Sequence, residues 1–168
     1  CNSLSLQSYL CIKFFHLRIA EIPRPNGMIQ FSNADAQAPL RGRKALKEVL
    51  QRMFEQERRP LRTLQYIFCT DEYLLRINQD FLQHDYYTDI ITFQLGDEPD
   101  TLGVEGEVYI SIDRVRDNAK TLGIPVGKEL LRVIFHGALH LCGYGDKTEE
   151  EVSLMRGKEE EYMRLLPG

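Results

Sequence analysis

Two histidines and an aspartate in the C-terminal third of the sequence have the spacing of a metal site. His136 and His140 are four residues apart, so on a helix their side chains would lie on one face, about 5–6 Å apart at Cβ. Two imidazoles at that spacing can bind one Zn²⁺, each nitrogen lying about 2.0–2.1 Å from the ion. Gly143 follows where such a helix should end, and a glycine there can reverse the chain and return Asp146 as a third ligand. Two histidines and one carboxylate leave a coordination position for water, as in catalytic zinc sites.

The surroundings of the histidines also allow a structural interpretation. A single histidine in an apolar, buried helix is usually a hydrogen-bonded core residue. Two buried histidines at this spacing are harder to supply with hydrogen-bond partners. Each buried polar group without a partner lowers the stability of the fold by about 1–3 kcal/mol. We therefore favour the metal interpretation. The apolar residues of this segment are Leu130, Leu131, Val133, Ile134, Phe135, Leu139 and Leu141.

The same spacing occurs in the metzincin protease motif H-E-x-x-H-x-x-G-x-x-H. Gly137 stands where those proteases have a glutamate general base, and Asp146 stands where they have a third histidine. The absence of that base argues against ordinary peptide hydrolysis. It leaves a metal-bound water, whose acidity zinc increases, as the expected nucleophile.

Three segments of the sequence resemble the YbeY family of zinc-dependent endoribonucleases, which act in rRNA maturation. Residues 136–146, HGALHLCGYGD, are similar to the HGxLHLxGYDH motif of that family. Asn78 with residues 88–93, TDIITF, is similar to its N…TDVLSF segment, and residues 106–111, GEVYIS, to its GDI-x-IS strand. The order and spacing of these segments agree from about Met28 to the C-terminus.

This resemblance implies a zincin-like α+β fold, with a small mixed sheet packed with helices and the zinc motif on a helix in the C-terminal half. It implies one Zn²⁺ per chain bound by His136, His140 and Asp146, with His136 and the zinc-bound water in the catalytic role. It also implies cleavage of single-stranded rRNA at the 16S 3′ end, with the small ribosomal subunit as partner. The sequence departs from the family at two positions: Asp146 replaces the usual histidine, and Leu82 stands where an arginine thought to serve RNA handling is usual.

The charges of the chain are unevenly distributed. Residues 1–65 contain 11 Lys and Arg against 5 Asp and Glu, whereas residues 66–168 contain 10 against 20, which gives the net charge of −4. Either both halves form ordinary solvated faces of the protein, or the basic half attracts an anion. We expect a basic helix ending at Pro60 to attract RNA phosphates independently of sequence. The residues proposed for this contact are Arg41, Arg43, Lys44, Arg58 and Arg59.

Asp89 and Glu107 lie beside segments with strand-like composition. Either could orient substrate or accept a hydrogen bond from a zinc-binding imidazole. The alternative is that both are surface residues of strands.

The hydrophobic periodicity predicts one α+β domain, because short β-like runs alternate with helical segments and the C-terminus is helical. Thr148 and Glu151 predict a capping box for the last helix. Residues 1–27 lack a regular pattern and are interpreted as a poorly ordered extension before the domain at 28–168. The predicted strands are 28–32, 64–69, 89–95 and 107–112, the second pair joined by a hairpin-like connection, and the predicted helices are 46–54, 71–81, 113–122, 127–142 and 148–166.

Composition excludes several classes of protein. The chain has 168 residues, of which 43% are hydrophobic and 27% charged, as in ordinary globular domains. No apolar run approaches the roughly 20 residues of a membrane span, so we expect a soluble protein without a membrane partner. Four scattered cysteines without a CxxC pair favour reduced thiols and a cytoplasmic location. Two alternative functions stay open: a metal-dependent hydrolase of peptides or small molecules, and a non-catalytic ribosome-assembly factor with structural zinc.

Overall fold

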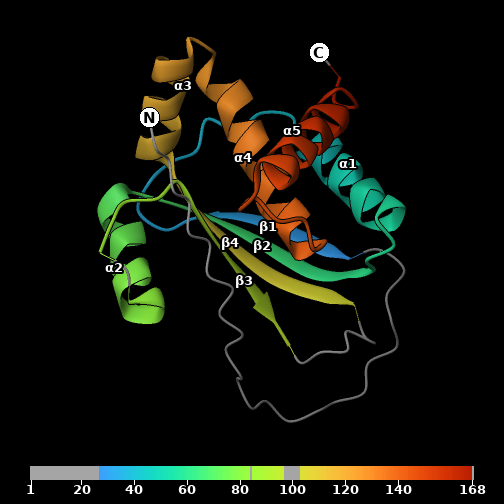
Figure 1. Ribbon diagram of the computed structural model, residues 1–168, viewed down its shortest axis with the longest axis horizontal. Coiled ribbons are helices and arrows are strands. Elements are labelled where there is room, and N and C mark those ends of the chain that lie inside the picture. Colours follow the sequence, from blue (N-terminus) through green and yellow to red (C-terminus); the bar gives the residue numbers. More distant parts are fainter. Residues whose placement is uncertain (1–26, 84, 97–102, 168) are drawn as a thin grey trace.

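The fold was analysed in a computed structural model that describes residues 27–83, 85–96 and 103–167 (Figure 1). The predicted extension at 1–27 lies, except for Gly27, outside the described residues, and so do Cys1 and Cys11. The boundary of the domain at residue 28 therefore stays a prediction. The elements are β1 (Met28–Asn33), α1 (Arg43–Gln56), β2 (Leu61–Cys69), α2 (Asp71–Leu82), β3 (Ile90–Leu95), β4 (Val104–Ser111), α3 (Ile112–Leu122), α4 (Val126–Leu141) and α5 (Glu149–Met163).

The four strands form one mixed sheet in the order β1-β2-β4-β3. β1 pairs parallel with β2 and β2 parallel with β4, whereas β3 runs antiparallel to β4. The predicted hairpin-like connection is confirmed, because β3 and β4 are adjacent, with Ile90 opposite Ile110 and Leu95 opposite Glu105. β3 is consequently an edge strand, and the metal motif lies near it.

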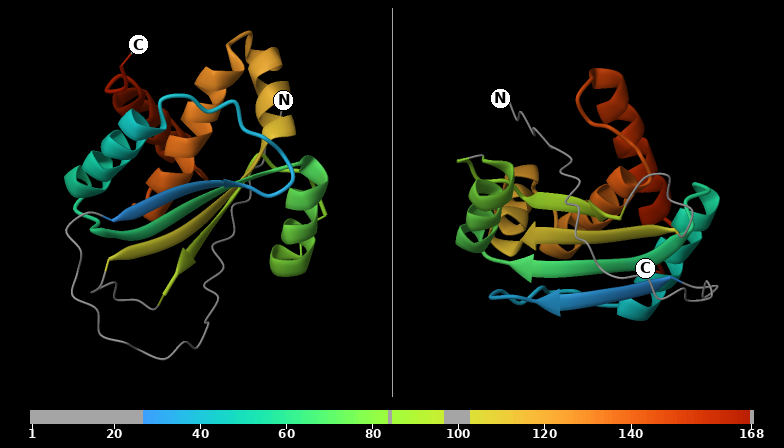
Figure 2. Two further views of the ribbon diagram at one scale, coloured as in Figure 1. Left: turned by 180° about the vertical axis from the view of Figure 1, so that it is seen from behind. Right: turned by 90° about the horizontal axis from the view of Figure 1, so that it is seen from below.

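Helices cover both faces of the sheet. Figures 1 and 2 show α1, α4 and α5 over one face, with α3 beside α4, whereas α2 lies on the opposite side. Successive residues of a strand point to opposite faces, and β3 follows this rule. Ile90 packs in the main core under α4, while Ile91 and Phe93 pack with Leu74 of α2. Burial on both faces explains why β3 is apolar almost throughout.

Two strands begin earlier than the sequence predicted. β2 starts at Leu61 rather than residue 64, and β4 starts at Val104 rather than residue 107. The two early segments pair with each other, Leu61 opposite Val104, so backbone pairing extends both strands beyond the continuous apolar runs seen in the sequence. Two helix ends deviate by as much: α1 starts at Arg43 rather than residue 46, and α5 ends at Met163 rather than residue 166. The capping box of Thr148 and Glu151 is confirmed.

Two glycines allow α4 to lie directly against β3 and β4. A Cβ atom on Gly137 would lie 2.8 Å from Ile90 Cδ1 and 2.8 Å from Val108 Cγ1. A Cβ atom on Gly106 would lie 2.5 Å from Leu141 Cδ1. This close approach sets the rotation of α4, and thereby the face on which the two motif histidines emerge. Within the described ranges, no helix has the length and hydropathy needed to cross a membrane.

Candidate metal centre

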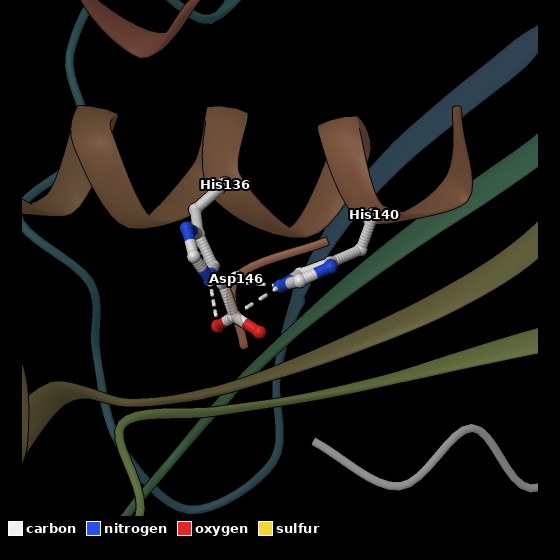
Figure 3. A group of neighbouring side chains, drawn as sticks. All are labelled: His136, His140 and Asp146. Atoms are coloured by element: carbon white, nitrogen blue, oxygen red, sulfur yellow. Dashed lines mark hydrogen bonds and ion pairs between the residues drawn. The ribbon is translucent and has the colours of Figure 1, made fainter. Parts of the chain in front are cut away.

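The three residues predicted to bind metal meet at one point beside α4. His136 and His140 project from α4, and Asp146 approaches them from the loop that follows (Figure 3). The Nε2 atoms of the two histidines are 2.9 Å apart, and each lies 3.7 Å from Oδ2 of Asp146. In a tetrahedral zinc site with ligand distances near 2.1 Å, neighbouring ligand atoms lie roughly 3.3 Å apart. The triad therefore fits one metal ion.

The outer nitrogen of each imidazole faces a hydrogen-bond acceptor. Nδ1 of His136 lies 2.6 Å from Oε1 of Glu159, and Nδ1 of His140 lies 2.8 Å from the carbonyl oxygen of Tyr144. These acceptors favour a proton on each Nδ1 atom and leave each Nε2 as the lone-pair nitrogen. Two lone pairs and a carboxylate oxygen then converge, which is the arrangement that a bound cation stabilises.

Without metal, the same arrangement attracts a proton. Burial lowers the pKa of His136, but hydrogen bonds and charges from Asp146 and Glu159 outweigh it and raise that pKa to about 9. Burial and the Glu57 carboxylate raise the pKa of the neighbouring Cys142 thiol to about 12. Cys142 is therefore protonated at neutral pH and does not compete as a thiolate ligand.

The loop that carries Asp146 is fixed at both ends. The Tyr144 amide donates to the Leu139 carbonyl at the end of α4, and Gly143 adopts φ 101°, a left-handed conformation that reverses the chain. The Tyr144 hydroxyl donates to Oε2 of Glu57, just after α1, at 2.7 Å. On the far side, the Lys147 amide donates to Glu151 of α5 at 2.8 Å. The reversal predicted at Gly143 is thus observed.

A buried ionic chain holds the residue behind His136. Arg132 donates two hydrogen bonds to Glu129, at 2.7 and 2.9 Å, and lies 3.4 Å from Oε2 of Glu159. Glu129 and Glu159 are both buried. Buried carboxylates need such partners, since an unpaired buried charge is strongly unfavourable. The chain Glu129–Arg132–Glu159 therefore fixes the carboxylate that orients His136.

A cavity of about 910 Å³ opens beside the triad. His136 and Asp146 line it, together with residues of β3, the end of α2, and helices α3, α4 and α5. This volume lies within the range of ligand-binding pockets, roughly 300–1,000 Å³. The site is consequently accessible to a substrate, unlike a structural metal site closed by four protein ligands.

The family model of Endoribonuclease YbeY matches residues 28–167 of this chain. The chain belongs to the YbeY family. An Endoribonuclease YbeY from Cytophaga hutchinsonii is 49% identical over 138 residues, which cover 82% of this chain and 94% of that protein. One from Porphyromonas gingivalis is 52% identical over 103 residues, covering 61% of this chain and 66% of that protein. A solution structure from Thermotoga maritima has a TM-score of 0.56 at 29% identity, covering 82% of this chain and 88% of that one.

The other residues that the sequence analysis related to the YbeY family lie at different places around the triad. Asp89 lines the cavity and lies 4.0 Å from Arg132, and its charge contributes to the raised pKa of His136. Glu107 accepts a hydrogen bond from Tyr109, and both project toward the α2 face of the sheet. Glu107 therefore lies across the sheet from the histidines. Leu82, where the motif resemblance predicted an arginine, lines the cavity as an uncharged residue.

The cations predicted to bind RNA fall into two separate groups. Arg41, Arg43 and Lys44 lie at the start of α1, whereas Arg58 and Arg59 follow its end. A helix of 14 residues separates the groups by about 20 Å. None of the five lines the cavity beside the triad. Their contact with RNA stays a prediction.

Sequence reasoning missed Glu159, Arg132 and Glu129. Each is a charged residue on the inner face of a helix, which is the pattern of a buried ion pair. Glu129 and Arg132 are also three residues apart on α4, so a local pair could have been predicted. Their connection through Glu159 to His136 depends on the packing of α5 against α4, for which the sequence carries no local signal.

Proposed function

We propose that this protein is a metal-dependent endoribonuclease that cleaves single-stranded rRNA in ribosome biogenesis. The observation that carries the proposal is the meeting of His136, His140 and Asp146 in the wall of an open cavity, in a chain of the YbeY family. As its finer parts, we propose Zn²⁺ as the metal, the 16S 3′ end as the substrate, the small ribosomal subunit as partner and the cytoplasm as location.

The residues of the triad have separable roles in this proposal. A bound divalent metal would supply Lewis acidity, polarising a phosphate oxygen and increasing the acidity of a coordinated water. Glu159 and the Tyr144 carbonyl hold the imidazoles so that both Nε2 atoms face the same point. Asp146 adds a negative charge, which favours a divalent cation over a neutral ligand. The remaining space of the cavity lies next to His136, where a phosphodiester would enter.

The alternative of a peptide hydrolase is less well supported by the geometry around Gly137. A protease of the related motif needs a glutamate there as general base. Even the first carbon of such a side chain would collide with Ile90 and Val108. A structural zinc is also less well supported, because the three ligands form a group beside open space rather than a closed tetrahedral set.

Cleavage by the metal-loaded full chain tests the proposal. We expect it to cleave a single-stranded RNA carrying the precursor 16S 3′ end, and to leave the same RNA in a duplex and an unfolded protein substrate intact. His140→Ala should lose both stoichiometric zinc, measured by elemental analysis, and cleavage. Asp146→His should retain zinc, since histidine is the usual residue of the family at this position. Cleavage by zinc-free His140→Ala, or cleavage of the protein substrate alone, would contradict the proposal.

A further inference from the structure

Four cationic side chains line the cavity that contains the triad. Lys128 and Arg132 come from α4, Arg156 comes from α5, and Arg164 directly follows the end of α5. Figure 1 shows these two helices side by side above the sheet. The charge state of these four residues therefore contributes to how the cavity attracts an RNA phosphate.

Two of the four cations have carboxylate partners within the protein. Arg132 is held by Glu129 and Glu159, as described above. Arg164 pairs with Glu160 at 3.0 Å. Both guanidinium groups already have carboxylate partners, so binding a phosphate would require them to exchange one anion for another.

Lys128 and Arg156 differ from the other two cations. Both are exposed, and within the described part of the chain neither forms an ion pair or a side-chain hydrogen bond. The cavity carboxylates Asp89 and Glu159 face Arg132, Glu160 faces Arg164, and Asp146 faces the histidines. The uncompensated positive charge of the cavity wall is therefore concentrated in these two side chains.

Their positions place one cation on each helix beside the triad. Lys128, Arg132 and His136 are spaced by four residues, which puts them along one face of α4, with Lys128 about 12 Å from His136 along the axis. Arg156 is three residues before Glu159, the carboxylate that contacts His136, and so lies on the same face of α5. Apolar side chains of Leu122, Ile124, Val152 and Met155 line the same cavity, which suits the faces of nucleobases.

The stability of α4 does not account for a lysine at position 128. It is the third residue of α4, where the positive end of the helix dipole disfavours a cation. A phosphate placed there would interact favourably with both the side chain and the helix end. Leu82 contributes no charge to this cavity, so the cations for a phosphate must come from other parts of its wall.

We propose that Lys128 and Arg156 bind the phosphates that flank the scissile position of a single-stranded RNA in this cavity. The proposal rests on the proposed function, because it takes RNA as the substrate. It assigns the electrostatic part of RNA binding to α4 and α5 rather than to the α1 segment. The strand would cross the triad from the beginning of α4 toward α5.

The test is the salt dependence of RNA binding by the metal-loaded full chain. A fluorescein-labelled 2′-O-methyl oligouridylate serves as the probe, and fluorescence anisotropy gives its affinity over a range of KCl concentrations. For a single strand, each phosphate contact contributes about −0.7 to the slope of log K against log salt. We expect Lys128→Gln and Arg156→Gln each to flatten the slope by about 0.7, and the double variant by about 1.4. Zinc content should be unchanged, and Lys128→Gln should not lower the melting temperature.

Arg52→Gln is the matched control, because Arg52 is an exposed cation of α1, lies outside the cavity and is not among the residues proposed to contact RNA. We expect it to leave the slope unchanged. Salt-dependent binding that the double variant does not weaken would overturn this proposal while leaving the endoribonuclease proposal intact. A flattened slope in Arg52→Gln alone would overturn the proposal and move the RNA path to α1. Failure of the wild-type chain to bind the probe at any salt concentration would contradict both proposals.

Discussion

Oε1 of Glu159 lies 2.6 Å from Nδ1 of His136, although the two residues belong to different helices. Glu159 is only 2% exposed, and its second oxygen faces Arg132. A buried carboxylate behind a metal-binding imidazole fixes the ring and increases its basicity. The affinity of the triad for metal therefore depends on the packing of α5 against α4.

Replacing Glu159 by glutamine should weaken metal binding while keeping the fold. The amide can still accept a hydrogen bond but lacks the charge that increases the basicity of His136, so we expect a loss of about 10–100-fold in affinity. Competition with a chelating dye measures it. Glu160→Gln is the control, because its side chain on the same helix is 68% exposed. Equal affinities in the two variants would show that Glu159 does not support the site.

The pKa of His136 predicts opposite pH dependences for stability and metal binding. Its pKa is raised from the usual 6.5 to about 9 in the metal-free fold. The stability gained from the protonated ring is therefore fully present below pH 6.5 and is lost as the pH rises through about 9. Metal affinity should rise over the same interval, because the metal displaces that proton. Melting temperatures after chelation and metal titrations check both trends, and His136→Gln should flatten the stability profile.

Gly137→Ala should destabilise the protein by about 1–3 kcal/mol, because the added methyl group overpacks the contact between α4 and the sheet. Urea unfolding measures this change. Gly157→Ala is the matched control within α5, where an added Cβ meets nothing within 4 Å. We expect this control to stabilise the protein by roughly 0.5–1 kcal/mol, since alanine is the better helix former. The same sign in both variants would refute the close packing of α4.

Tyr144→Phe should affect the metal more than Tyr162→Phe. Both hydroxyls donate to the carboxylate of Glu57, so each variant should lose about 1.5–3 kcal/mol of stability. Tyr144, however, belongs to the loop that carries Asp146, whereas Tyr162 lies on α5. We expect faster release of zinc to a chelator from Tyr144→Phe. Indistinguishable release rates would show that the loop is held without this bond.

The meeting of the three candidate metal ligands could be predicted from the sequence because their relation is local. A four-residue helical spacing and one glycine turn bring His136, His140 and Asp146 together, and no distant contact is needed. The roles of Asp89 and Glu107 could not be separated in advance, because the face to which a strand residue points depends on register. Glu107 points toward α2, and Asp89 lies beside Arg132.

The positions of the basic residues in space also could not be predicted from local spacing. Counting charges along α1 does not show that Arg43 and Arg58 lie at opposite ends of a helix about 20 Å long. Lys128 and Arg156 give no cluster in the sequence, and only the packing of α4 against α5 brings them to one cavity. The same packing positions Glu159. Tertiary contacts between α4 and α5 thus bring together residues whose proximity cannot be predicted from their spacing in the sequence.

The three proposed metal ligands occupy a segment of only 11 residues, from 136 to 146. Closing so short a loop costs little entropy, and the histidine pair needs a single helical turn. We therefore expect a newly synthesised chain to bind zinc before the sheet has assembled, and a peptide of residues 126–148 to bind it weakly in isolation. Affinity for incompletely folded chains reduces the stabilisation that metal gives the native state. Loading of this enzyme would then be an early step of its folding, and Glu159 would retain the ion once α5 docks.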